Sequence, residues 1–136
     1  MDNPLLKNIV AAVVGVIVAG VTVGIVEMAG HAIFPPPEGL DITNPEDQAR
    51  IMQEIPAAAK VAVMIAWFLG AFAGSWTARK LGATSWPSWL VIALMIGASV
   101  FTTQMFPHPW WMVLGALILP VIALMISGRM IPRPRP

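Results

Sequence analysis

Four long apolar runs, separated by short polar or proline-rich segments, make up most of this chain of 136 residues. The runs cover about residues 9–34, 57–78, 86–106 and 110–131. Each run is about as long as the roughly 20 apolar residues that an α-helix needs to cross the hydrocarbon core of a bilayer. The pattern therefore predicts an all-α fold: an integral membrane bundle of four transmembrane helices that forms a single domain over residues 1–136.

The loop between the first two runs, about residues 35–56, begins with three prolines, which cannot continue a helix. A short amphipathic helix is predicted later in this loop, because Asn44 is a favourable N-cap and Pro45 suits the first helical turn. Glu46 and Asp47 follow, at the positive end of the helix dipole. Its apolar face consists of Ile51, Met52 and Ile55. The alternative is a disordered acidic loop, because short helices are marginally stable alone.

Charged residues divide between the two ends of the predicted spans. Six of the eight basic residues lie at one end: Lys7, Arg79, Lys80, Arg129, Arg133 and Arg135. Five of the seven acids lie in the 35–56 loop: Glu38, Asp41, Glu46, Asp47 and Glu54. Because cytoplasmic loops carry an excess of Lys and Arg, this asymmetry predicts that both termini are cytoplasmic and that the acidic loop is outside. We expect a multi-pass protein of the bacterial cytoplasmic membrane.

The composition excludes several classes of protein. The chain is 57% hydrophobic and 11% charged, whereas soluble domains carry about 25% charged residues. It has no cysteine, which excludes thiol–disulfide catalysis and cysteine-ligated metal sites. No basic cluster indicates a nucleic-acid partner, and no G-x-S-x-G, H-E-x-x-H or phosphate-binding glycine loop indicates an enzyme. We therefore expect the lipid bilayer as the main partner, and we predict no cofactor and no catalytic residue.

Small residues recur at every fourth position of the second span. They are Ala58, Ala62, Ala66, Gly70, Gly74 and Ala78. The first span has Gly20 and Gly24 at the same spacing. In lipid this spacing lets helix backbones approach closely, so that dispersion contacts hold the helices together. We expect these residues to pack within the chain; packing against a second copy or another membrane protein is the alternative.

Glu27 is the only acid inside a predicted span, and an ionised carboxylate within a bilayer needs a structural or functional reason. His31 lies one helical turn later, on the face that also carries Gly20 and Gly24. That face is predicted to pack, so both side chains are expected to point into the bundle at its outer end. Lys60 and His108 are predicted at the same depth, which makes these four residues the candidate polar site.

Three interpretations of this site remain open. Glu27 can be structural, paired with Lys60 or hydrogen-bonded to His31. It can instead serve a proton- or cation-linked solute site, which favours a transporter-like or accessory subunit of a membrane complex. Glu27, His31 and His108 also supply the ligand types of a two-histidine–one-carboxylate metal site, and two histidines allow a haem by count. The corresponding functions are transport or accessory subunit, scaffold or assembly partner, and metal-binding membrane protein.

Overall fold

The computed structural model describes residues 2–132, and these form five α-helices. They are α1 (Pro4–Ile33), α2 (Pro45–Glu54), α3 (Ala57–Leu81), α4 (Trp86–Met105) and α5 (Trp110–Met130). Within this described part, α1, α3, α4 and α5 are each long and apolar enough to cross a membrane, which confirms the predicted all-helical class with four candidate spans. Arg133 and Arg135, which the sequence analysis placed with the other basic residues, lie outside the described residues.

The observed helices match the predicted spans to within one residue, except that α1 begins five residues early, at Pro4, and α3 ends three residues late, at Leu81. The reason for the early start is a cap: the Asn3 side-chain oxygen accepts hydrogen bonds from the backbone N–H groups of Leu5 (2.9 Å) and Leu6 (3.4 Å). Such bonds satisfy N–H groups that have no partner in the first turn of a helix. The helix therefore extends beyond its apolar run, into a segment that carries Lys7.

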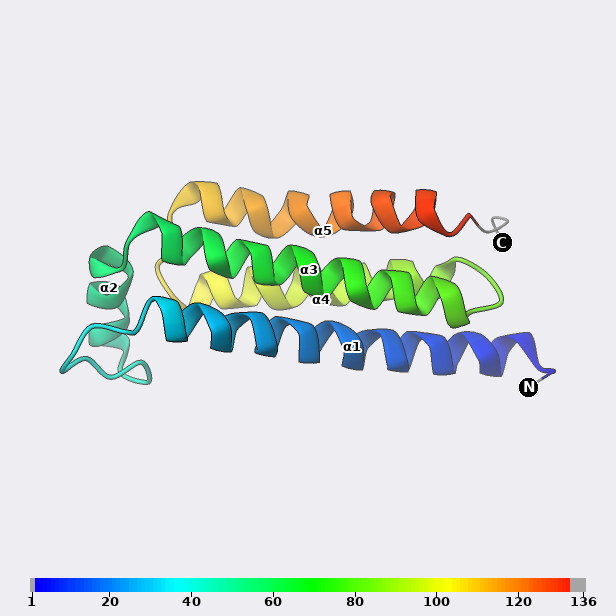
Figure 1. Ribbon diagram of the computed structural model, residues 1–136, viewed down its shortest axis with the longest axis horizontal. Helices are drawn as coiled ribbons and strands as arrows, with labels where there is room; N and C mark the ends of the chain where they lie inside the picture. Colours follow the sequence, from blue (N-terminus) through cyan, green and yellow to red (C-terminus); the bar gives the residue numbers. More distant parts are fainter. Residues whose placement is uncertain (1, 133–136) are drawn as a thin grey trace.

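The four long helices lie side by side along the length of the molecule, and α2 lies across one end (Figure 1). We call this end the α2 end. The first turn of α1, the α3–α4 turn and the last turn of α5 lie together at the opposite end, which we call the terminal end (Figure 1). Helix α3 contacts α1, α4 and α5, whereas α1 contacts only α3 and α4 among the described helices. Helix α3 is thus the centre of the bundle.

Helices α1 and α3 cross at a contact made by glycines. A Cβ atom added at Gly74 would lie 2.7 Å from the Ala19 Cβ and 2.7 Å from the Gly15 carbonyl oxygen. One added at Gly15 would lie 2.8 Å from the Gly74 carbonyl oxygen and 2.8 Å from the Ala78 Cβ. One added at Gly70 would collide with the Val23 side chain. The second half of the α3 small-residue stripe is therefore occupied by α1 of the same chain.

The structure corrects the expectation that Gly20 and Gly24 pack within the bundle. Both are exposed, and a Cβ added at either would meet nothing within 4 Å. The packed glycine of α1 is Gly15, and a helix turns about 100° per residue, so Gly20 points roughly 140° away from it and Gly24 roughly 180° away. In α3, Ala66 is buried and Ala62 is half-buried, but Ala58 is exposed.

A buried asparagine joins α1 to the α3–α4 turn at the terminal end. The Asn8 side-chain oxygen accepts hydrogen bonds from the backbone N–H groups of Ala83 (2.7 Å) and Thr84 (3.1 Å). Its side-chain nitrogen donates to the Thr84 hydroxyl oxygen over 3.0 Å. One buried side chain thus satisfies backbone polar groups of the turn that have no partner within a helix.

The polar contact between α3 and α5 is also buried. The hydroxyl oxygens of Ser75 and Ser127 lie 3.0 Å apart, and both residues are fully buried. Each hydroxyl also bonds to a backbone carbonyl one turn earlier in its own helix. Such a contact adds about 0.6 kcal/mol on average between helices in a bilayer.

Helix α2 closes one end of the bundle. The Asn44 side chain caps it by accepting from the Glu46 N–H over 3.1 Å, as its sequence predicts. Met52 packs into a core with Trp67, Met112 and Ala116.

Outside the spans, Thr43 donates two hydrogen bonds to Asp41, from its N–H and its hydroxyl, and these hold the pKa of that carboxyl below its usual value. The loop is therefore organised by its own hydrogen bonds and by the apolar face of α2.

The glycine crossing should dominate stability. We predict that Gly74→Ala lowers the free energy of unfolding by about 1–3 kcal/mol, because the new methyl group meets a backbone oxygen and a fixed Cβ. The matched control, Gly24→Ala, adds the same methyl into open space and should be neutral or stabilising by up to about 1 kcal/mol, through helix propensity. Thermal unfolding in detergent measures both variants. Equal melting temperatures of Gly74→Ala and Gly24→Ala would contradict the close contact of α1 and α3 at Gly74.

Candidate functional site

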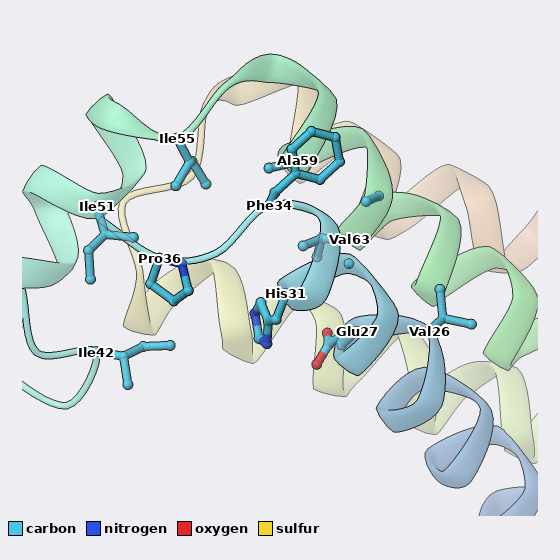
Figure 2. Close-up of a pocket in the computed structure, with 12 residues that line it drawn as sticks. Val26, Glu27, His31, Phe34, Pro36, Ile42, Ile51, Ile55, Ala59 and Val63 are labelled. Atoms are coloured by element: carbon cyan, nitrogen blue, oxygen red, sulfur yellow. The ribbon is translucent and has the colours of Figure 1, made fainter. Parts of the chain in front are cut away.

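A small cavity lies between the last turns of α1, the first turns of α3, and α2 with the loop before it (Figure 2). Its volume is about 80 Å³. Ten of its twelve lining residues are apolar, glycine or proline; Glu27 and His31 are the two polar ones. The ten are Val26, Gly30, Phe34, Pro36, Ile42, Ile51, Ile55, Ala59, Ala62 and Val63. We call this space the α1–α3 cavity.

The wall of this cavity follows from the α1–α3 packing. Counted from Gly15 at about 100° per residue, Val26 and Gly30 return to the face that meets α3. Gly30 lies close enough that a Cβ added there would sit 3.7 Å from the Ala62 Cβ. Glu27 is one residue past Val26, so its side chain leaves α1 at the edge of the contact. Glu27 and His31 are predicted from the sequence to point into the bundle, but in the structure Glu27 is half-buried and His31 is exposed.

The Glu27 carboxylate faces the cavity and makes no hydrogen bond or ion pair with residues 2–132. None of the hydrogen bonds there reaches it, and the ion pair found in this part of the chain joins Arg50 to Glu54 over 3.3 Å. The expected pair with Lys60 is therefore not formed, nor is a hydrogen bond to His31. Figure 2 shows the carboxylate and the imidazole projecting from α1 one turn apart, below the loop.

Lys60 and His108 lie in a different hollow at the same end of the bundle. It is about 290 Å³ and is also lined by Met52, Gln53 and the prolines on either side of His108. The reason is the direction of each side chain around the axis of α3. Ala59, Ala62 and Val63 face the α1–α3 cavity, and Lys60 projects about 100° away from Ala59. Both residues lie at the α2 end of the bundle, but the site that Lys60 and His108 were expected to share with Glu27 and His31 is not formed.

His108 is held by its own turn. Its Nδ1 atom lies 2.9 Å from the Phe106 carbonyl oxygen, and its ring centroid lies 6.1 Å from that of Trp67. Since Glu27, His31 and His108 are divided between two hollows, they do not assemble the metal site that their residue types suggested. Within residues 2–132, no group of three or more His, Cys, Asp or Glu side chains is placed to hold a metal ion.

The geometry of the α1–α3 cavity limits what can bind there. Pockets for drug-sized ligands have volumes of about 300–1,000 Å³, so this cavity is too small for such a molecule in the conformation described. It has room for a few water molecules or a small ion. Carboxylate oxygens bind hard cations and protons, and imidazole exchanges protons near neutral pH. The arrangement is therefore suited to a proton or a small cation.

The residues that close the cavity were not predicted from the sequence. Gly30 and Ile42 were not singled out, and Ile51 and Ile55 were recognised only as the apolar face of a loop helix. One signal was present in the sequence: Ala11, Gly15, Ala19, Val26 and Gly30 lie on one face of the helix, and this face leads to the cavity wall.

Comparison of the chain with protein-family models, with curated proteins and with solved structures gives no significant match.

Proposed function

We propose that this chain is a small multi-pass membrane protein in which Glu27, assisted by His31, binds a proton or a small cation, and that it acts as a transporter-like or accessory subunit of a membrane complex. One observation carries the proposal: a half-buried carboxylate faces an apolar cavity without a hydrogen bond or an ion pair from residues 2–132. Removing a carboxylate from water without a partner is costly, so a ligand that supplies positive charge would stabilise it.

The cavity's position supports exchange with solvent. It lies at the α2 end, where the neighbouring His31 is exposed and the acids of the loop lie on the same side. A cation that approaches this end meets negative charge before it meets Glu27. The apolar wall lowers the local dielectric around the carboxylate, which strengthens its interaction with a bound positive charge.

We also propose that the α2 end faces the outside and that the membrane is the bacterial cytoplasmic membrane. Lys7, Arg79, Lys80 and Arg129 all belong to the terminal end of the bundle. An excess of Lys and Arg marks cytoplasmic loops, and the four candidate spans among residues 2–132 bring the start of α1 and the end of α5 to the same side. The α1–α3 cavity then opens toward the outer surface.

A second role, as a scaffold or assembly partner, is favoured by the outward face of α1. Gly20 and Gly24 are exposed, four residues apart, and nothing lies within 4 Å of a Cβ added at either. A helix of another protein, or of a second copy, can approach closely at this spacing. Recovery of a stable complex from membranes, lost on Gly24→Leu but kept on Gly97→Leu, would favour this role; Gly97 is equally open but lies on α4.

The orientation is tested by single cysteines, because the native chain has none. Glu46 and Leu81 are exposed residues at opposite ends of the bundle. In intact cells we expect Glu46→Cys to react with a membrane-impermeant maleimide and Leu81→Cys to react only after the membrane is permeabilised. The reverse labelling pattern would invert the proposed topology and would place the cavity on the cytoplasmic side.

The role of Glu27 is tested by Glu27→Gln, which keeps the shape of the side chain and removes its charge. Because no ion pair is broken, we expect the free energy of unfolding to stay within about 1 kcal/mol of the wild-type value. In liposomes that contain the protein and a pH-sensitive dye, an imposed Na⁺ or K⁺ gradient should move protons through the wild type. Glu27→Gln should reduce this flux to that of protein-free liposomes.

The matched control is Glu54→Gln, which removes an exposed carboxylate at the same end of the bundle and should keep the flux. Equal flux through Glu27→Gln and the wild type would contradict the assignment of Glu27. If liposomes that contain the wild type show no greater proton flux than protein-free liposomes, transport by this chain alone would be contradicted. A strongly destabilised Glu27→Gln would show instead that the carboxylate is structural.

A further inference from the structure

An open groove runs between α4 and α5 in the half of the bundle near the terminal end. It encloses about 500 Å³, and most of its lining is aliphatic. Trp89 of α4 and Gly128 of α5 lie at its terminal end, and Ile96 and Val121 lie at its inner end. Among the residues that the structure describes, Arg79 of α3 is the one charged residue in its lining. The groove shares no residue with the α1–α3 cavity, so its function is independent of the one proposed there.

The length of this groove and its position along the bundle match one leaflet of a bilayer. Ile96 comes seven positions after Trp89, and Gly128 seven positions after Val121, which corresponds to roughly 10 Å along each helix. Ile96 and Val121 lie near the middle of their helices. A groove that runs from the end of a bundle to its middle covers most of the roughly 15 Å of hydrocarbon in one leaflet. It fits an extended acyl chain that enters from the surface.

The charge lies at the end where a lipid headgroup would be. The Arg79 side chain is 8% exposed, and one terminal nitrogen lies 3.1 Å from the position of a Cβ on Gly128. Its other terminal nitrogen donates to the Ile131 carbonyl oxygen over 3.4 Å. The guanidinium is thereby held at the mouth of the groove by the end of α5. Its planar set of donors is suited to phosphate oxygens.

We propose that this groove binds an anionic phospholipid, with its phosphate at Arg79 and one acyl chain between α4 and α5. Basic pockets between transmembrane helices bind the headgroups of anionic lipids, and the positive charge here adjoins a slot for the chain. A zwitterionic lipid fits the slot but gains less from the guanidinium. Exposed Trp89 lies at the depth where tryptophan is enriched at the membrane interface.

The experiment compares lipids retained by the purified full-length protein. The protein is exchanged into detergent with equal amounts of phosphatidylglycerol and phosphatidylcholine that carry the same acyl chains, and retained lipids are counted by native mass spectrometry. We expect the wild type to retain about fivefold more phosphatidylglycerol, the preference that one basic residue near a bilayer gives. Arg79→Gln should remove this preference, whereas Lys80→Gln, a charge removed from the same end but outside the groove, should keep it.

A second variant tests the groove without changing Arg79. Ala93 lies in the groove and Ala98 is exposed on α4 outside it, so Ala93→Phe fills the slot and Ala98→Phe is its control. We expect Ala93→Phe to lose most of the retained phosphatidylglycerol and Ala98→Phe to keep it, with equal melting temperatures. If Arg79→Gln fails to fold, the comparison of Ala93→Phe with Ala98→Phe still tests whether the groove binds the lipid. Equal retention of both lipids by the wild type, an unaffected Ala93→Phe, or an equal loss in Lys80→Gln would overturn the proposal.

Discussion

The close approach of α1 and α3 at Gly15, Gly70 and Gly74 sets the positions of most other features of this molecule. In lipid the hydrophobic effect does not drive helices together, so two helices gain from contact only as far as their surfaces fit. Here the backbones are so close that a methyl group at any of the three glycines would meet atoms at less than van der Waals distance. A helix pair of this kind has one register, because sliding or rotation would bring larger side chains into the contact.

That register has consequences at both ends of α1. At the terminal end it places Asn8 where its side chain can bond the backbone of the α3–α4 turn, and so α1 also fixes the start of α4. At the α2 end it places Gly30 against Ala62, which leaves Glu27 at the rim of the contact and His31 beyond it. The α1–α3 cavity is therefore a product of helix packing. Helix α2, too short to be stable alone, completes it through Ile51 and Ile55.

The spans and the loop helix could be predicted from the sequence because their signals are local. Apolar length and proline positions determine where a helix can cross a bilayer, and Asn44 with Pro45 marks the start of α2. The packing face of α1 could not be predicted, because both faces of a membrane helix are apolar and hydropathy does not separate lipid contact from protein contact. Gly20 and Gly24 have the same spacing as Gly15 and Ala19, and only the three-dimensional fit distinguishes the two pairs.

The same limit applied to the candidate site. Depth in the membrane is readable from distance along a helix, but direction around the helix axis depends on which faces are in contact. Lys60 and His108 were therefore expected beside Glu27, and the structure turns Lys60 toward another hollow. The role of Asn8 was equally hidden, because its partners are 75 and 76 residues away in the sequence.

The contact between Gly30 and Ala62 tests this account most directly, since it joins the helix register to the wall of the cavity. The chain has no cysteine, so a pair of engineered cysteines reports without background. In Gly30→Cys/Ala62→Cys the two Cβ atoms should lie about 3.7 Å apart, within the range of about 3.5–4.5 Å that disulfides require. Mild oxidation in membranes should give rapid cross-linking within one chain, and Gly24→Cys/Ala62→Cys should give none. Absence of the first cross-link, or equal cross-linking of both pairs, would contradict the account.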